Sequence, residues 1–164
     1  MTEEEKQLLF KDLVARLPYT PMVNLRGKAG YDRKLVSVHR YTTRNEFEIV
    51  VNSDDDEDYM PHNFEIEIVK PYLRPMSSMT EDERKELSNL VNNELNGNQE
   101  DDDCLPWVLY DSTGIKNQTG GERFYFNEMS IIYDWFNEHH FDYRGLIGMG
   151  LALPAPKGMY DIKK

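Results

Sequence analysis

The strongest constraint on this chain is the alternation of apolar and polar residues along short segments. Residues 46–51 read EFEIVV and residues 64–68 read FEIEI, so apolar side chains recur at every second position. This period of two is typical of a β-strand with one face on a core and the other in water. Segments 23–25 and 35–41 are also rich in β-forming residues. No crossover helix separates the four segments, so we expect antiparallel pairing within residues 22–69.

Three helices are predicted around this β unit. Thr2 and Glu5 form a capping-box pattern, apolar residues follow at helical spacing, and Pro18 ends the segment. Thr80 and Glu83 repeat the capping pattern further along the chain. The predicted helices cover 2–17, 80–96 and 127–140, and two more strands are predicted at 105–110 and 122–126.

These elements indicate an α+β fold. The length of 164 residues suits a single domain over 1–164. We expect a small antiparallel β-meander or an SH3-like barrel at 22–69, packed with the N-terminal helix at 2–17. The two further helices belong to a mixed C-terminal part at 80–164.

Charge is distributed unevenly along the sequence. The formal net charge is −11, and acidic runs at 54–58 and 100–103 account for most of it. Residues 24–44 carry the opposite sign and contain interleaved aromatics. Such a segment suits contacts to phosphates and stacked bases, or it is a solvated hairpin that offsets the acidic loops. The candidate binding residues here are Arg26, Arg33, Lys34, Arg40 and Tyr41.

Tyr72 and Arg74 form a second candidate binding element. They lie between Pro71 and Pro75, which favours a rigid, exposed segment. Tyr and Arg are enriched in protein-binding hot spots, so the segment is a candidate docking edge. The alternative is that it only redirects the chain from a strand into a helix.

His139, His140 and Asp142 are the densest group of potential metal ligands. Imidazole and carboxylate suit zinc, manganese or iron. The two histidines are adjacent, however, whereas ligands on one helical face need a spacing of three or four residues. A helix terminus with Asp142 paired to Arg144 explains the same residues. We therefore assign no metal and expect no cofactor.

Two long stretches resemble a known family. Residues 70–81 read KPYLRPMSSMTE and residues 139–147 read HHFDYRGLI. With the opening and closing segments, they resemble a family of small uncharacterised proteins encoded by gut anaerobes and their phages or mobile elements. The resemblance implies an intracellular accessory protein of phage origin, and it carries no activity, cofactor or catalytic residue.

Three functions follow as hypotheses. The sequence holds no nucleophile elbow and no phosphate-binding loop, which favours a non-enzymatic accessory protein that binds a partner protein through its β unit. The alternatives are a nucleic-acid-binding protein that uses residues 26–44 and a metal-dependent hydrolase that uses His139, His140 and Asp142. The single cysteine, Cys104, fits a reducing cytoplasm. No apolar run approaches the ~18 residues of a membrane span, so we expect no membrane partner.

Overall fold

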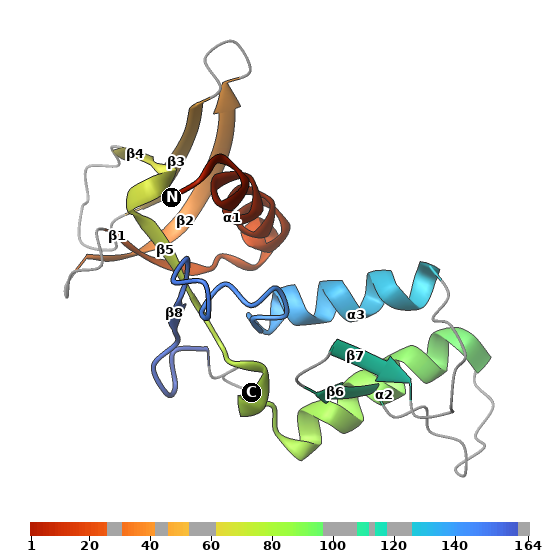
Figure 1. Ribbon diagram of the computed structural model, residues 1–164. Coiled ribbons are helices and arrows are strands. Elements are labelled where there is room, and N and C mark those ends of the chain that lie inside the picture. Colours follow the sequence, from red (N-terminus) through yellow and green to blue (C-terminus); the bar gives the residue numbers. More distant parts are fainter. Residues whose placement is uncertain are drawn as a thin grey trace. The chain divides into compact units, whose positions relative to one another are not determined.

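The chain forms two compact units in the computed structural model (Figure 1). Unit 1 combines Met1–Pro75 with Asn137–Lys164, and unit 2 is Met76–Phe136. The sequence-based expectation of one domain stays a prediction. The structure describes residues 1–25, 31–41, 46–52, 62–96, 108–111, 114–117 and 126–160.

Unit 1 is built on an open six-stranded sheet in the order β4-β3-β2-β1-β5-β8. Neighbouring strands are antiparallel except β5 and β8, which are parallel. The strands are β1 (Met22–Leu25), β2 (Asp32–Tyr41), β3 (Glu46–Asn52), β4 (His62–Glu65), β5 (Val69–Leu73) and β8 (Leu153–Pro154).

Helix α1 (Glu3–Arg16) packs on this sheet, and its start is the predicted one. The Thr2 hydroxyl accepts the Glu5 N–H at 3.2 Å, and the Glu5 carboxylate accepts the Thr2 N–H at 2.7 Å. This reciprocal capping box satisfies two helix-end donors. The helix ends at Arg16, and η1 (Leu17–Tyr19), a short 3-10 turn containing Pro18, follows it.

The core of unit 1 joins both ends of the chain. Leu9 and Leu13 of α1 are fully buried against the sheet, and Leu146 and Leu151 from the C-terminal segment complete the same cluster. Alternate residues of β3 supply its centre, as their period of two predicts. The strand residues of the cluster are Val23, Leu25, Leu35, Phe47, Ile49, Val51, Val69 and Leu73.

The mixed α+β class is confirmed, and strands β1 to β4 form an antiparallel meander as expected. The sheet is open, so the SH3-like barrel is not confirmed. The last predicted strand is shorter than expected, because the chain leaves β4 after Glu65 and turns through η2 (Ile66–Ile68).

Strand β5 was not predicted from the sequence. Pro71 lies inside β5 and pairs with Val23 of β1. On the other side, β8 pairs only with Tyr72 and Leu73, so the ladder on that side does not reach Pro71. A proline nitrogen directed to that side costs no ladder hydrogen bond, which is why a proline is tolerated there.

The described residues of unit 2 form two α-helices and a hairpin. The second capping box is confirmed: the Glu83 carboxylate accepts the Thr80 N–H at 2.8 Å, and the Thr80 hydroxyl accepts the Glu83 N–H at 3.2 Å. The Trp135 indole N–H donates to the Glu86 carboxylate at 3.3 Å. The elements are η3 (Met76–Ser78), α2 (Glu81–Asn96), β6 (Val108–Asp111), β7 (Gly114–Asn117) and α3 (Phe126–Glu138), whose last two residues belong to unit 1.

The two strands expected at 105–110 and 122–126 fall within unit 2, and each lies only partly in the described residues. The strand expected at 105–110 overlaps β6, which extends to Asp111. The strand expected at 122–126 is wrong at Phe126, where α3 begins, and residues 122–125 lie outside the described part of the chain. Among the helices of the described residues, none is long and apolar enough to span a membrane.

Candidate functional site

The candidate site lies where strand β3 extends beyond the end of its neighbour β4. The last residue pair between these strands is Glu48 with Glu65, after which the chain turns away into η2. Strand β3 continues to Phe47 and Glu46, which pair with β2 on the other side. The edge of the sheet is therefore stepped, and we call this step the β3 notch.

A hollow of about 380 Å³ occupies the β3 notch. Its walls come from the start of β3, the end of β4 with η2, Tyr41 of β2 and Lys6 of α1. These elements belong to unit 1. We call this hollow the acidic groove, because it is lined by four carboxylates: Glu46, Glu48, Glu65 and Glu67.

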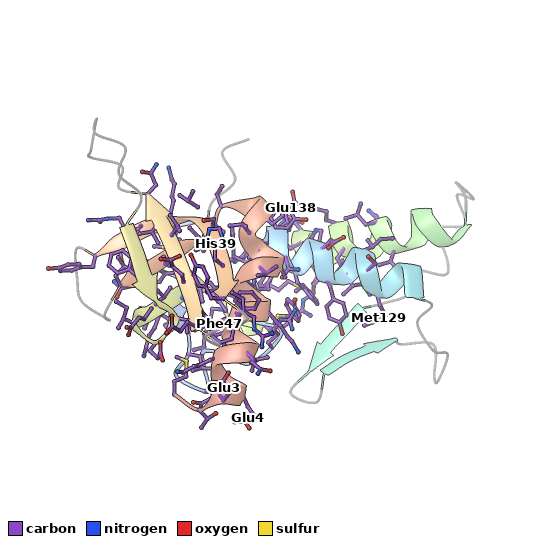
Figure 2. All side chains as sticks on the ribbon, turned by 90° about the horizontal axis from the view of Figure 1, so that it is seen from above. Glu3, Glu4, His39, Phe47, Met129 and Glu138 are labelled. Carbon is purple, nitrogen blue, oxygen red and sulfur yellow. The ribbon has the colours of Figure 1, made fainter. Side chains whose placement is uncertain are left out.

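The apolar residues that line the groove pack against α1 and the core of unit 1. Phe47 is buried, and its ring centroid lies 5.0 Å from that of Phe10 in α1. The Arg40 guanidinium carbon lies 5.5 Å from the same ring centroid. Phe47 thus lies where the sheet meets α1 (Figure 2). Ile66 is also buried, and Phe64 packs against the core.

Two carboxylates of the groove face each other on neighbouring strands and carry the same charge. Glu48 and Glu65 are directly opposed across β3 and β4, an arrangement in which like charges repel. Glu48 accepts a hydrogen bond from the Tyr41 hydroxyl at 2.6 Å. Such a surface attracts cations. The rings of Phe47 and Phe64, which we call the aromatic floor of the groove, accommodate the carbon chain of an organic cation.

Lys6 is the one cationic residue among the described residues that line the groove. Its ammonium group forms an ion pair with Glu67. Their hydrogen bond raises the pKa of Lys6 and lowers the pKa of Glu67, and both shifts favour the charged pair. The other three carboxylates leave the groove with an excess of negative charge.

The predicted basic residues do not gather on one face. Arg33 and Lys34 are consecutive in β2, so their side chains project to opposite faces of the sheet. Arg33 donates to the Asp32 carbonyl at 2.7 Å. Arg40 lies over Phe47, and Tyr41 lines the acidic groove. Arg26 lies outside the described residues, as do the acidic runs 54–58 and 100–103 and Cys104.

Tyr72 and Arg74 hold the C-terminal segment in place. The Tyr72 hydroxyl donates to Asp32 at 2.8 Å, and the Tyr72 carbonyl accepts the Tyr160 hydroxyl at 3.0 Å. Burial and the hydrogen bond to Asp32 raise the pKa of Tyr72. The Arg74 guanidinium lies 4.2 Å from the Phe141 ring centroid. Both residues thus have structural contacts within unit 1, and their predicted role in docking stays a prediction.

The histidine pair lies just beyond α3. His140 has a positive φ of 57° and stacks on Tyr160 with 3.8 Å between ring centroids. Burial, and then the nearby Arg16 guanidinium, lower the pKa of His140 to about 3, so its imidazole is neutral at neutral pH. His139 is buried as well. In the part of the chain with defined placement, no group of three His, Cys, Asp or Glu side chains is arranged to hold a metal ion.

Asp142 has other partners than the sequence suggests. Its carboxylate accepts the backbone N–H groups of Leu146 at 2.7 Å and Ile147 at 2.9 Å, which fixes the turn after α3. The Arg144 guanidinium instead lies 3.2 Å from the carboxylate of Asp12. The expected pairing of Asp142 with Arg144 is therefore replaced by a backbone cap.

Sequence reasoning missed the residues that form the acidic groove. Alternation predicts only that one face of each strand is exposed to solvent, and this face carries Glu46, Glu48 and Glu65. Alternation identified that face correctly, but the register that places Glu48 opposite Glu65 is not visible in it. The turn after Glu65, which brings Glu67 to the groove, breaks the same alternation.

The chain matches no family model, no curated protein and no solved structure. The resemblance to proteins of gut anaerobes and their phages stays a prediction.

Proposed function

We propose that unit 1 is a non-enzymatic docking module that binds a basic segment of a partner protein in the acidic groove. The observation that carries this proposal is the combination of a buried aromatic floor with four carboxylates around it. A cytoplasmic location and a phage origin, both expected from the sequence, belong to the proposal.

Charge complementarity favours a basic protein segment over nucleic acid. Phosphates are repelled by the carboxylates of Glu46, Glu48 and Glu65, whereas Lys and Arg side chains gain from them. The aliphatic stems of these side chains also cover apolar surface such as Phe64. A segment with alternating basic and apolar residues satisfies both parts of the groove.

Fluorescence polarisation tests the proposal with a labelled octapeptide of alternating lysine and valine. We expect binding that weakens steeply with salt, because the attraction is electrostatic. The double variant Glu48→Gln/Glu65→Gln should weaken it at least tenfold. The matched control Glu81→Gln/Asp82→Asn removes the same charge from exposed positions in α2 and should bind like the parent protein.

Two outcomes would contradict the proposal. One is the absence of peptide binding at low salt, and the other is equal binding by the parent and the groove variant. A labelled single-stranded oligonucleotide serves as a second probe. Oligonucleotide binding that is lost in Arg33→Ala/Lys34→Ala would instead support the nucleic-acid hypothesis.

A further inference from the structure

We infer that the partner segment binds as an added β-strand alongside β3, in the β3 notch and in line with β4. This inference rests on the proposed function and specifies how the segment is held. It follows from the register of the sheet, because the acidic groove and the step in the sheet edge share the same residues.

Among the described residues, the ladder between β3 and β4 stops at Glu48, so we infer hydrogen-bonding capacity in the backbone of β3 beyond it. Consecutive residues of a strand direct their N–H and C=O groups to opposite neighbours. Phe47 and Glu46 pair with Arg40 and Tyr41 of β2, so one of the two directs both its backbone groups away from β2. Strand β4 has already ended opposite Glu48. One residue of an incoming strand would exchange two hydrogen bonds with this position.

The side chains of β3 then determine the sequence pattern of the partner. Directly opposed residues in a sheet share a face. A partner residue opposite Phe47 lies on the core-facing side, whereas a partner residue opposite Glu46 lies on the acidic side, next to Glu65 in the position opposite Glu48. The matching pattern is therefore an apolar residue opposite Phe47 and a basic residue opposite Glu46. A second copy of β3 does not fit, because it would oppose acidic residues with acidic residues.

The position of Glu65 opposite Glu48 strengthens this preference for a basic strand. Glu48 already faces the like charge of Glu65, and Glu46 adds a third carboxylate on the same strand. A lysine or arginine inserted opposite Glu46 would lie near all three and offset their repulsion. Main-chain hydrogen bonds supply affinity in this mode of recognition, and the alternate side chains supply specificity.

Backbone methylation of the probe separates strand addition from charge attraction. We would compare the lysine–valine octapeptide with two derivatives, one N-methylated at every lysine and one at every valine. In an added strand, either the lysine amides or the valine amides face β3, because consecutive residues direct their N–H groups to opposite sides. The derivative methylated on the amides that face β3 should bind at least tenfold more weakly, while the other should bind like the parent peptide. As a second readout, hydrogen exchange of either the Glu46 or the Phe47 amide should slow on binding.

The outcomes distinguish the inference from the proposed function. If both derivatives lose binding, or if neither does, strand addition is contradicted. Binding of the unmethylated peptide would still support docking in the groove. Failure of the unmethylated peptide to bind removes the docking proposal itself, and the inference with it.

Discussion

Glu48 and Glu65 face each other across β3 and β4 as the last pair of that ladder. An opposite charge in either position would stabilise the sheet edge, whereas two carboxylates destabilise it. The groove thus carries a local cost in the free protein that a bound cation would remove. Residues that serve binding often contradict the rules that serve stability.

The first prediction concerns the stability of the sheet edge. The variant Glu65→Gln should raise the free energy of unfolding by about 0.2–1 kcal/mol, because it removes the repulsion of like charges across strands. Urea denaturation at low salt would measure the gain, and the gain should shrink as salt screens the parent protein. A loss of stability instead would show that the attraction between Glu65 and Lys6 outweighs this repulsion.

The second prediction concerns the buried ion pair of α1. Arg16 donates to the Asp12 carboxylate at 2.8 and 3.1 Å and to the Phe141 carbonyl at 2.7 Å. Arg16→Met should lower the free energy of unfolding by about 3–5 kcal/mol, since a buried carboxylate loses its main partner. The double variant Asp12→Leu/Arg16→Met should recover part of this loss.

Chemical denaturation of the three proteins forms the measurement for this pair. Lys11→Met, which removes an exposed cation from the same helix, is the matched control and should differ little from the parent. A double variant no more stable than Arg16→Met would indicate that the Phe141 contact, not the charge pair, dominates.

The third prediction concerns acid stability and His140. The unfolded chain binds a proton on this imidazole below its ordinary pKa of 6.5, whereas the folded protein keeps it neutral down to about pH 3. The unfolded state therefore binds more protons in this window. The free energy of unfolding should fall as pH decreases, by up to about 1.4 kcal/mol per pH unit from this group.

The charges of Arg16, His139 and Arg74 act in the same direction as burial at His140. His140→Asn should flatten the pH dependence between pH 6 and pH 4 in denaturation experiments, since asparagine does not titrate and tolerates the positive φ. His39→Asn removes an exposed imidazole and serves as the control. An unchanged slope in His140→Asn would remove His140 as the cause.

The fourth prediction concerns the hydroxyl of Tyr160. It accepts the Met22 N–H and donates to the Tyr72 carbonyl, both at 3.0 Å. Tyr160→Phe keeps the ring on His140 but leaves these two backbone groups without the partner, so stability should fall by about 1–3 kcal/mol. Thermal and urea denaturation would measure it, with Tyr31→Phe at an exposed position as the control. Equal stability of parent and Tyr160→Phe would contradict the assigned bonds.

Local rules predicted the elements whose causes are local. The capping boxes at Thr2 and Thr80 need only residues three apart, and both are present. The meander also followed from alternation and short connections. Strand β5 was missed because Pro71 was interpreted from its own chemistry, while its tolerance depends on how far β8 extends.

The candidate site was less predictable for a related reason. The acidic groove depends on the register of β3 with β4 and on the turn at Ile66, and neither is encoded in a short pattern. The buried pair of Asp12 and Arg16 has the helical spacing of an ordinary surface pair. The packing of the C-terminal segment, which brings Phe141 to Arg16, adds a buried partner that this spacing does not predict.

The contact between Arg16 and Phe141 spans 125 positions of the chain. A ribosome makes residue 16 long before residue 141, so the N-terminal strands of unit 1 must wait for Leu146 and Leu151 before their core is complete. Unit 2 is continuous in sequence and has no such delay. During synthesis, therefore, the N-terminal part of unit 1, which carries the groove, emerges before the residues that complete the core of that unit.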